Sequence, residues 1–90
     1  MSSVKDTFNF AVSQINSGLN GYKFSNDEKL KLYGYYKQAT IGKCNTQKPS
    51  MFNLIDKAKW EQWNSLGNMS KDDAMLKYSS LYLDIMNNQK

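Results

Sequence analysis

The segment from Ser25 to Gly42 constrains the fold most, because both of its ends carry the sequence marks of a helix terminus. Residues Ser25 to Glu28 match an S-x-x-E capping box, in which the serine side chain accepts an amide of the first turn and the glutamate side chain reaches back to the serine amide. Gly42 follows Ile41 as the residue type that most readily adopts the left-handed conformation beyond a helix. No proline lies between them, so Lys29 to Ile41 is predicted to continue as a helix of about four turns.

One side of this predicted helix mixes aromatic, hydroxyl and cationic groups. At about 100° per residue, that side carries Leu30, Tyr33, Tyr36, Lys37 and Thr40. A buried face does not need the lysine, and a solvated face does not need the tyrosines. The spacing alone leaves two interpretations open. The face binds a ligand that is flat in one part and anionic in another, or the helix is half-buried and its tyrosine hydroxyls stay in water.

Apolar periodicity predicts another helix before this segment and two after it. The first has a stripe at intervals of four, three and four residues, formed by Phe8, Val12, Ile15 and Leu19. It is expected to end between Gly18 and Gly21, and Asp6 either caps it or places a negative charge at the positive end of its dipole.

Residues 42–54 show no helical period, and Pro49 prevents the preceding helix from continuing. The next helix is predicted from Asp56 to Leu66, where Trp60 and Trp63 share one side. Tryptophans spaced in this way are more often core anchors than stacking platforms, which favours the packing interpretation.

The last helix opens on a second capping box, Ser70 to Asp73, and residues 87–90 are expected to fray. Its inward stripe is formed by Ala74, Tyr78, Leu81, Tyr82 and Ile85. Tyr78 stands out in this stripe, since a phenol among aliphatic side chains needs a partner for its hydroxyl. No strand-like alternation occurs, so the 90 residues are predicted to form one all-α domain, 1–90, with four helices around one core.

The residue types that are absent exclude several chemistries. The chain has no histidine and a single cysteine, Cys44, so we expect no Cys/His metal site, no Ser–His or Cys–His catalytic pair and no enzymatic activity. No apolar run is long enough to span a bilayer and no leader precedes the first helix, which predicts a cytoplasmic location.

All 12 basic residues are lysines, and the net charge is +4. A reader of specific nucleic-acid sequences normally relies on the bidentate fork of arginine, so this composition argues against one. The lysine excess suits a phosphate-bearing ligand or an anionic surface equally well. A single-strand nucleic-acid binder, a protein-interaction bundle and a module for anionic membranes remain alternatives at this point.

Four groups of residues in register resemble the acyl-CoA-binding protein family. The family pattern is Tyr-x-x-Tyr-Lys-Gln-Ala-Thr-x-Gly, an Asn-x-x-x-Pro loop, Lys-Ala-Lys-Trp-x-x-Trp, and Ser-x-x-[DE]-Ala-Met-x-x-Tyr. This chain matches it with Tyr33, Tyr36 to Thr40, Gly42, Asn45, Pro49, Lys57 to Trp60, Trp63, Ser70, Asp73 to Met75 and Tyr78. The spacing holds without a gap from about Ser25 to the end.

The resemblance implies an up-down-down-up four-helix bundle, with the long loop joining the second and third helices. It also implies a non-catalytic carrier that binds long-chain acyl-CoA esters such as palmitoyl- or myristoyl-CoA, for pool formation and transport. No cofactor, metal, nucleic acid or stable membrane insertion belongs to this picture, and a monomer is expected.

Carried over residue by residue, Tyr33, Lys37 and Lys59 are expected to contact the 3′-phosphate and ribose of CoA. Tyr36 and Tyr78 are expected to contact the adenosine and the rest of the headgroup. Tyr35, about 200° around the helix from Tyr33, is predicted to face away from the ligand.

The chain also departs from the family pattern near the expected site. Asn16 stands where the first helix often carries a lysine aimed at the CoA phosphates, and Lys23 is a possible substitute for that charge. Ile55-Asp56 replaces the usual Lys-Gly, which predicts a more apolar groove and a shifted chain-length preference. Asn16, Leu30 and Ile55 are therefore secondary ligand-binding candidates. Lys43-Cys44 and Ser50 also depart from the family pattern, which concerns loop conformation more than headgroup binding.

Overall fold

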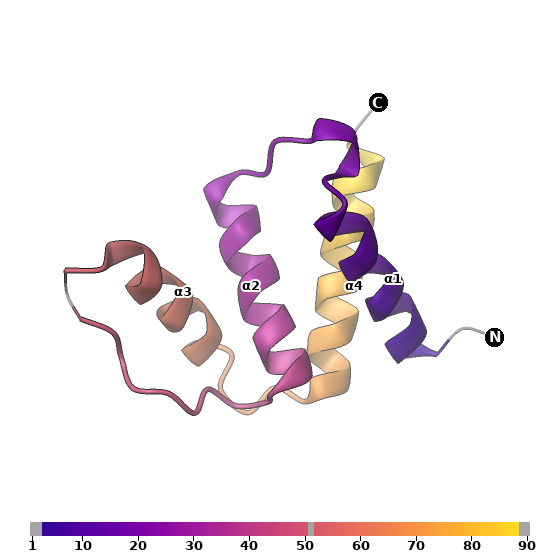
Figure 1. Ribbon diagram of the computed structural model, residues 1–90. Helices are drawn as coiled ribbons and strands as arrows, with labels where there is room; N and C mark the ends of the chain where they lie inside the picture. Colours follow the sequence, from indigo (N-terminus) through magenta and orange to yellow (C-terminus); the bar gives the residue numbers. More distant parts are fainter. Residues whose placement is uncertain (1–2, 51, 89–90) are drawn as a thin grey trace.

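The computed structural model describes residues 3–50 and 52–88. In these residues α1 spans Val4–Asn16, α2 Asn26–Thr40, α3 Leu54–Asn64 and α4 Lys71–Asn87, with a short 3₁₀ turn, η1, at Leu19–Gly21. Figure 1 shows α1 and α4 running in one direction and α2 and α3 in the other, with a long connection from the end of α2 to the start of α3. The up-down-down-up arrangement expected from the sequence is confirmed.

The start of α2 has both hydrogen bonds of the predicted capping box. The Glu28 amide donates to Ser25 Oγ at 3.1 Å, and the Ser25 amide donates to Glu28 Oε1 at 2.9 Å. The same carboxylate also accepts from the Tyr22 hydroxyl, at 3.0 and 3.1 Å, which ties the preceding connection to the helix. At the start of α4, Ser70 Oγ accepts the Asp73 amide at 3.0 Å.

Several predicted helix boundaries need correction, among them the end of the third helix, which lies at Asn64 and not at Leu66. Ser3 caps α1 by accepting the Asp6 amide at 3.0 Å, so Asp6 is a first-turn residue near the positive end of the dipole and not the cap. Helix α3 begins at Leu54, two residues before Asp56, because the Asn53 side chain accepts the Asp56 amide at 3.3 Å. Helix α4 extends through Asn87, one residue into the tail that was expected to fray.

Leu19 is buried as predicted but does not lie on α1. The helix ends at Asn16, and Gly18 adopts a φ of 92°, which turns the chain. Leu19 follows with a φ of 45° and points back into the core from η1. A positive φ costs a branched side chain about 1–2 kcal/mol, and burial of the leucine offsets this.

The core lies where α4 meets α1 and α2. Its buried members are Phe8, Ala11, Leu19, Leu32, Ala39, Ala74, Tyr78, Tyr82 and Ile85. Helix α3 stands to one side and, in the described part of the chain, packs against α2 and no other helix (Figure 1).

Three side chains hold α3 and the long connection in place. The buried Trp63 indole donates to the Gly42 carbonyl at 2.8 Å, and the Trp60 indole donates to the Thr46 carbonyl at 2.9 Å. Fully buried Gln38 donates to two carbonyls of the α3–α4 connection, at 2.7 and 3.0 Å. The core-anchor role expected of both tryptophans is therefore confirmed for Trp63, whereas Trp60 is half-buried and anchors only the long connection.

Gly34 explains how closely α3 approaches α2. A Cβ added at this position would lie 3.0 Å from Gln62 Cγ and 3.4 Å from the Gln62 carbonyl carbon and oxygen. A larger residue would therefore require Gln62 to give way by a few tenths of an ångström. None of the described helices combines the length and apolar character needed to cross a membrane.

Candidate ligand-binding cleft

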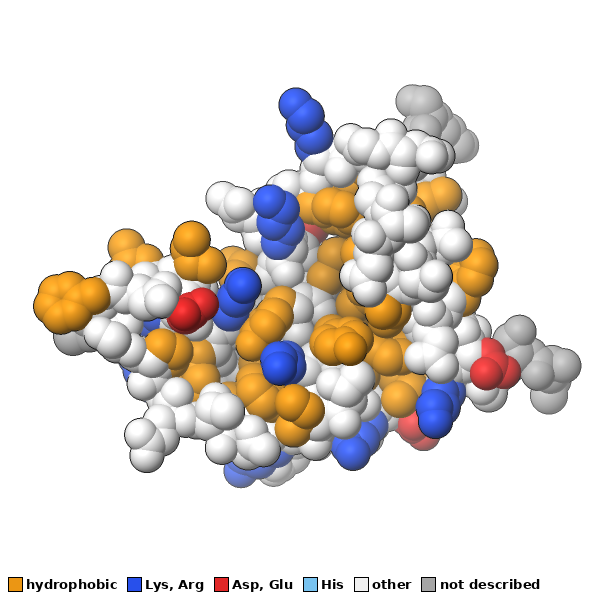
Figure 2. All heavy atoms as spheres, in the orientation of Figure 1, with side chains coloured by type: hydrophobic (Ala, Val, Ile, Leu, Met, Phe, Trp, Pro, Cys, Tyr) orange, Lys and Arg blue, Asp and Glu red, His pale blue; other side chains and the backbone are white. Residues whose placement is uncertain are grey.

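An open cleft of about 570 Å³ brings together predicted site residues from four helices. Asn16 comes from α1, Tyr33 and Tyr36 from α2, Lys59 from α3 and Tyr78 from α4. In Figure 2, hydrophobic side chains and lysines alternate over the middle of the visible face, where Figure 1 places α2. The mixed face predicted for this helix is thus part of a concave surface.

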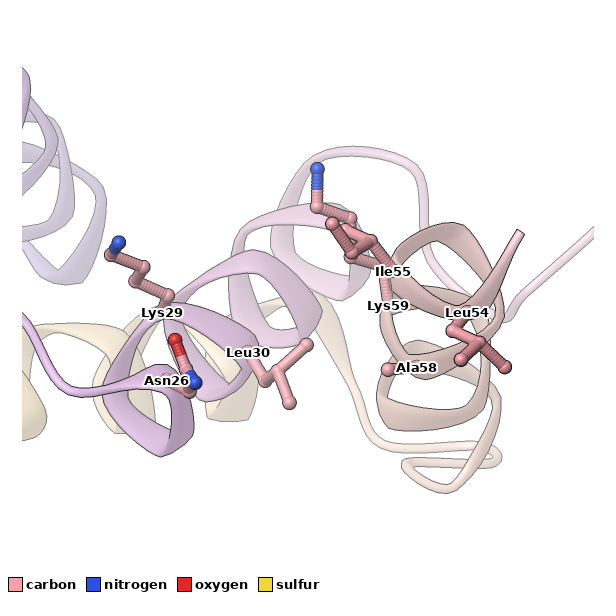
Figure 3. Close-up of a pocket in the computed structure, with 7 residues that line it drawn as sticks. All are labelled: Asn26, Lys29, Leu30, Leu54, Ile55, Ala58 and Lys59. Carbon is pink, nitrogen blue, oxygen red and sulfur yellow. The ribbon is translucent and has the colours of Figure 1, made fainter. Parts of the chain in front are cut away.

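A second groove of about 510 Å³ lies between the first half of α2 and α3. It contains the other two secondary candidates, Leu30 and Ile55, together with Asn26, Leu54 and Ala58. Figure 3 shows Leu30 and Ala58 facing each other across the gap between the helices. Ile55 is 71% exposed, so its side chain is available to a ligand and is not committed to the core.

Lys37 lines neither hollow, yet it lies beside the same tyrosine as Lys59. Its Nζ is 5.8 Å from the centroid of the Tyr33 ring, and Lys59 Nζ is 5.4 Å from that centroid. Lys37 Nζ also lies 5.7 Å from the Trp63 ring. Ammonium groups at these distances are attracted by the ring quadrupole, so two positive charges lie beside the Tyr33 ring.

Tyr78 belongs to the core and to the cleft at once. Its ring packs edge-on against Phe8 at a centroid distance of 5.2 Å, and the Tyr36 ring lies 6.4 Å from it. Only 3% of the residue is exposed. Burial, with a smaller contribution from neighbouring Tyr36, raises the pKa of Tyr78 to about 12, so the phenol is neutral and can donate a hydrogen bond at physiological pH.

The three cleft tyrosines keep their hydroxyls available. Within residues 3–50 and 52–88, the hydroxyls of Tyr33, Tyr36 and Tyr78 make no hydrogen bond to the protein, whereas Tyr22 is bonded to Glu28. Burial first, and then the charge of Asp56, also raise the pKa of Tyr33. The cleft therefore offers hydrogen-bond donors beside two ammonium groups, a combination that suits an anionic, partly aromatic molecule.

Tyr35 and Thr40, both on α2, line neither hollow and make other contacts. Tyr35 is half-buried against the hydrophobic core and lines neither hollow, in agreement with its predicted orientation. The Thr40 hydroxyl donates to the Tyr36 carbonyl at 2.8 Å, within its own helix. The part of the predicted face that lines the cleft or the groove is therefore narrower than its sequence pattern.

Sequence reasoning missed Lys29, which lines both the cleft and the groove. A signal for it was present, because Lys29 precedes Tyr33 by four residues and Lys37 by eight and so shares their side of α2. Four apolar residues that line the cleft were also missed as site candidates: Val12, Ile15, Phe24 and Leu32. The described residues contain no group of three or more Asp, Glu, Cys or His side chains placed to hold a metal ion.

An all-helical bundle with an open cleft of phenols, aromatic rings and ammonium groups has the architecture of a small ligand-binding domain. The family model described as "Acyl CoA binding protein" matches residues 5–82. The chain belongs to the acyl-CoA-binding protein family.

Several curated proteins share this sequence over part of their length. "Acyl-CoA-binding domain-containing protein 5" of Xenopus tropicalis is 51% identical over 73 residues, which are 79% of this chain and 16% of that protein. "Acyl-CoA-binding protein" of Gossypium hirsutum is 52% identical over 54 residues, 60% of this chain and 61% of that protein. "Enoyl-CoA delta isomerase 2" of Homo sapiens is 55% identical over 56 residues, 62% of this chain and 14% of that protein. The chain thus corresponds to only a small part of the longer relatives.

Solved structures match the whole bundle. The crystal structure of the Moniliophthora perniciosa acyl-CoA-binding protein superposes with a TM-score of 0.87 at 37% identity, covering 97% of this chain and 82% of that one. The solution structure of the Babesia bovis acyl CoA binding protein gives a TM-score of 0.80 at 43% identity, covering 96% of both chains.

Proposed function

We propose that this domain binds long-chain acyl-CoA esters, such as palmitoyl- or myristoyl-CoA, noncovalently and without changing them chemically. One observation carries the proposal: a single cleft gathers Tyr33, Tyr36, Lys59 and Tyr78, with Lys37 on the same tyrosine ring, and adjoins a mainly apolar groove. A polar, anionic headgroup and an aliphatic chain need two such neighbouring surfaces. The family membership and the names of the relatives support this ligand class.

The 3′-phosphate of CoA fits the surroundings of Tyr33. This phosphate carries close to two negative charges at neutral pH, and Lys37 and Lys59 bring two ammonium groups within 6 Å of the Tyr33 ring. Neither lysine belongs to an ion pair among the described residues, so the positive charge is available. Hydrogen bonds to charged groups contribute about 1.5–3 kcal/mol each, which makes this subsite selective for CoA over an uncharged headgroup.

The adenosine fits beside Tyr36 and Tyr78. Tyr36 is 41% exposed, so one face of its ring is open for stacking, whereas Tyr78 presents its hydroxyl from a fixed position against Phe8. A rigid partner reduces the entropy lost on binding. We assign the adenosine and the neighbouring part of the headgroup to this pair.

The acyl chain fits the groove lined by Leu30, Ala58 and Ile55. Complete removal of about fourteen methylenes from water would contribute up to ~11 kcal/mol at ~0.8 kcal/mol each, and chain ordering and partial exposure reduce this. We infer that the phosphate subsite selects CoA and that the chain supplies most of the affinity.

Calorimetric titration with palmitoyl-CoA, CoA and palmitate tests the proposal directly. Palmitoyl-CoA should bind much more tightly than either of its parts, and Lys37→Gln should weaken palmitoyl-CoA and CoA by a similar factor while leaving palmitate unchanged. Equal affinities for CoA and palmitoyl-CoA would contradict the inferred division of roles. Failure of the wild-type domain to bind any acyl-CoA would contradict the function itself.

We extend the proposal to a monomeric carrier that keeps a cytoplasmic pool of acyl-CoA and transports it, with no catalytic residue of its own. The absence of histidine and the available tyrosine hydroxyls support a binding role over an enzymatic one. Incubation with palmitoyl-CoA, followed by mass analysis of the thioester, checks this point. The thioester should remain intact beyond its uncatalysed hydrolysis.

A further inference from the structure

Lys29 and Lys59 are the two residues that line both the cleft and the groove. Lys29 comes from the first turns of α2 and Lys59 from α3, and both lie at the passage where the two hollows meet. Figure 3 shows both ammonium groups rising on the same side of the helices, above the line from Leu30 to Ala58. A ligand that occupies both hollows therefore comes close to these two cations.

No local interaction accounts for the charge of Lys29. The ion pairs among the described residues join Lys31 to Asp27, at 3.1 Å, and Lys48 to Glu61, at 3.9 Å. The carboxylate adjacent to Lys29, that of Glu28, is bonded to the Ser25 amide and the Tyr22 hydroxyl. A cation in the first turns of a helix also gains nothing from the helix dipole. Lys29 therefore presents an uncompensated ammonium group at the passage.

The order of groups in the proposed ligand matches the order of surfaces in the protein. An acyl-CoA carries its 3′-phosphoadenosine at one end and its acyl chain at the other, with a diphosphate and then an uncharged arm between them. Resting on the function proposed above, the adenosine lies by Tyr36 and Tyr78 and the chain by Leu30. Of the parts of the ligand between these two ends, only the diphosphate is anionic, so it is the part that cations at the passage attract.

We propose that Lys29 is the cation that binds the diphosphate of the CoA headgroup, from α2 and not from α1. The residue across the same cleft on α1 is Asn16, which is uncharged, so the first helix supplies no ammonium group at this point. The Lys59 ammonium group lies at this passage and also interacts with the Tyr33 ring, whose centroid is 5.4 Å away. Within residues 3–50 and 52–88 Lys29 belongs to no ion pair, so its ammonium group is available to the diphosphate.

Two ligands and three variants separate the diphosphate from the 3′-phosphate. Lys29→Gln should weaken binding of palmitoyl-CoA about tenfold, and should weaken palmitoyl-dephospho-CoA, which lacks the 3′-phosphate, by the same factor. Lys37→Gln should weaken only the ligand that carries the 3′-phosphate. Lys31→Gln is the matched control, because Lys31 lies two residues away on the same helix, pairs with Asp27 and lines neither hollow.

A rescue variant makes the assignment specific. Adding Asn16→Lys to Lys29→Gln should restore most of the lost affinity for both ligands, since residue 16 lines the same cleft. Lys29 is solvent-exposed, so Lys29→Gln is expected to keep the melting temperature of the wild type in the absence of ligand.

The outcomes distinguish this inference from the proposed function. If the wild type binds palmitoyl-CoA and Lys29→Gln binds it equally well, the diphosphate assignment is wrong and the function stands. If Lys29→Gln affects only the ligand with the 3′-phosphate, Lys29 belongs to the other phosphate subsite and the assignment is again wrong. If the wild type binds neither ligand, the proposed function itself is overturned.

Discussion

Tyr78 connects the core of this protein to its cleft, and its ionisation links stability to pH. Burial raises its pKa in the folded chain to about 12, against about 10 when it is unfolded. Between these values the folded chain keeps the phenol proton and the unfolded chain has released it, so rising pH favours unfolding. The stabilisation is fully present below pH ~10 and is lost as the pH approaches ~12, a change on the order of 2 kcal/mol.

Tyr78→Phe should remove this part of the pH dependence. Urea unfolding at pH ~8 and pH ~11.5 should show a smaller loss of stability for the variant than for the wild type. The other tyrosines and the lysines titrate in both proteins and cancel in the difference. Parallel losses would contradict the raised pKa. The variant should also bind palmitoyl-CoA more weakly, because a hydroxyl proposed to meet the headgroup is gone.

Ile55 is the residue at which this chain departs from the family pattern inside the groove. Its side chain is 71% exposed and lies beside Leu54, so a ligand chain that contacts it removes apolar surface from water. Ile55→Lys should therefore reduce affinity most for the acyl chains long enough to reach it. Titration of acyl-CoA esters of increasing chain length checks this, and an unchanged rank order would disprove the role.

At the scale of the element, Gly34 controls the distance between α2 and α3. Alanine normally favours a helix over glycine by about 1 kcal/mol. Here the new Cβ would lie 3.0 Å from Gln62 Cγ, and overpacking typically costs about 1–3 kcal/mol. Gly34→Ala should therefore be destabilising on balance and should weaken palmitoyl-CoA binding, because α3 carries Lys59 and Ala58.

The pair Gly34→Ala and Gln62→Ala tests this explanation. Removing the Gln62 side chain leaves the backbone contact at 3.4 Å, so the double variant should recover part of both losses. Urea unfolding and calorimetry measure the two effects. A single Gly34→Ala variant that is more stable than the wild type, with unchanged affinity, would show that the helices are not held at this distance by the glycine.

The observed helix boundaries show which local sequence signals are sufficient to predict where a helix begins. Both capping boxes predicted the starts of α2 and α4, because all the partners lie within a few residues of one another. The start of α3 was predicted too late because its cap, Asn53, precedes the apolar pattern. Leu19 was assigned to the first helix because its spacing continued the stripe, although the chain turns at Gly18.

At the scale of the whole molecule, α3 is the described α-helix with the fewest buried residues, since Trp63 alone is buried in it. It packs against α2 alone among the described helices and is otherwise held by the indole hydrogen bonds of Trp60 and Trp63 to the long connection. Segments with few buried contacts open at lower free energy than the rest of a domain. Amides of α3 should thus exchange with solvent faster than those of α2 and α4.

Ligand binding should change the relative rates of amide exchange in these helices. Because the proposed ligand contacts Lys59, Ala58 and Ile55 on α3 as well as α2, palmitoyl-CoA should slow exchange in α3 more than in the second half of α4. Hydrogen exchange followed by mass spectrometry, with and without palmitoyl-CoA, measures both effects. Protection confined to α1 and α4 would contradict binding in both the cleft and the groove. Palmitate alone should give little protection.

The sequence by itself determined the helical class, the order of the four helices and the mixed face of α2, because caps and apolar periods act over one to four residues. The resemblance between patterns added the family, which is confirmed. The binding roles of Tyr33, Tyr36, Lys37, Lys59 and Tyr78 stay predictions. Only the tertiary structure decided that four of them share one cleft and that Lys29 lies where the cleft and the groove meet. It also decided that Lys37 lies beside the Tyr33 ring without lining the cleft itself. These facts depend on the distance and the rotation at which separate helices pack. Both are determined by contacts between residues far apart in the chain.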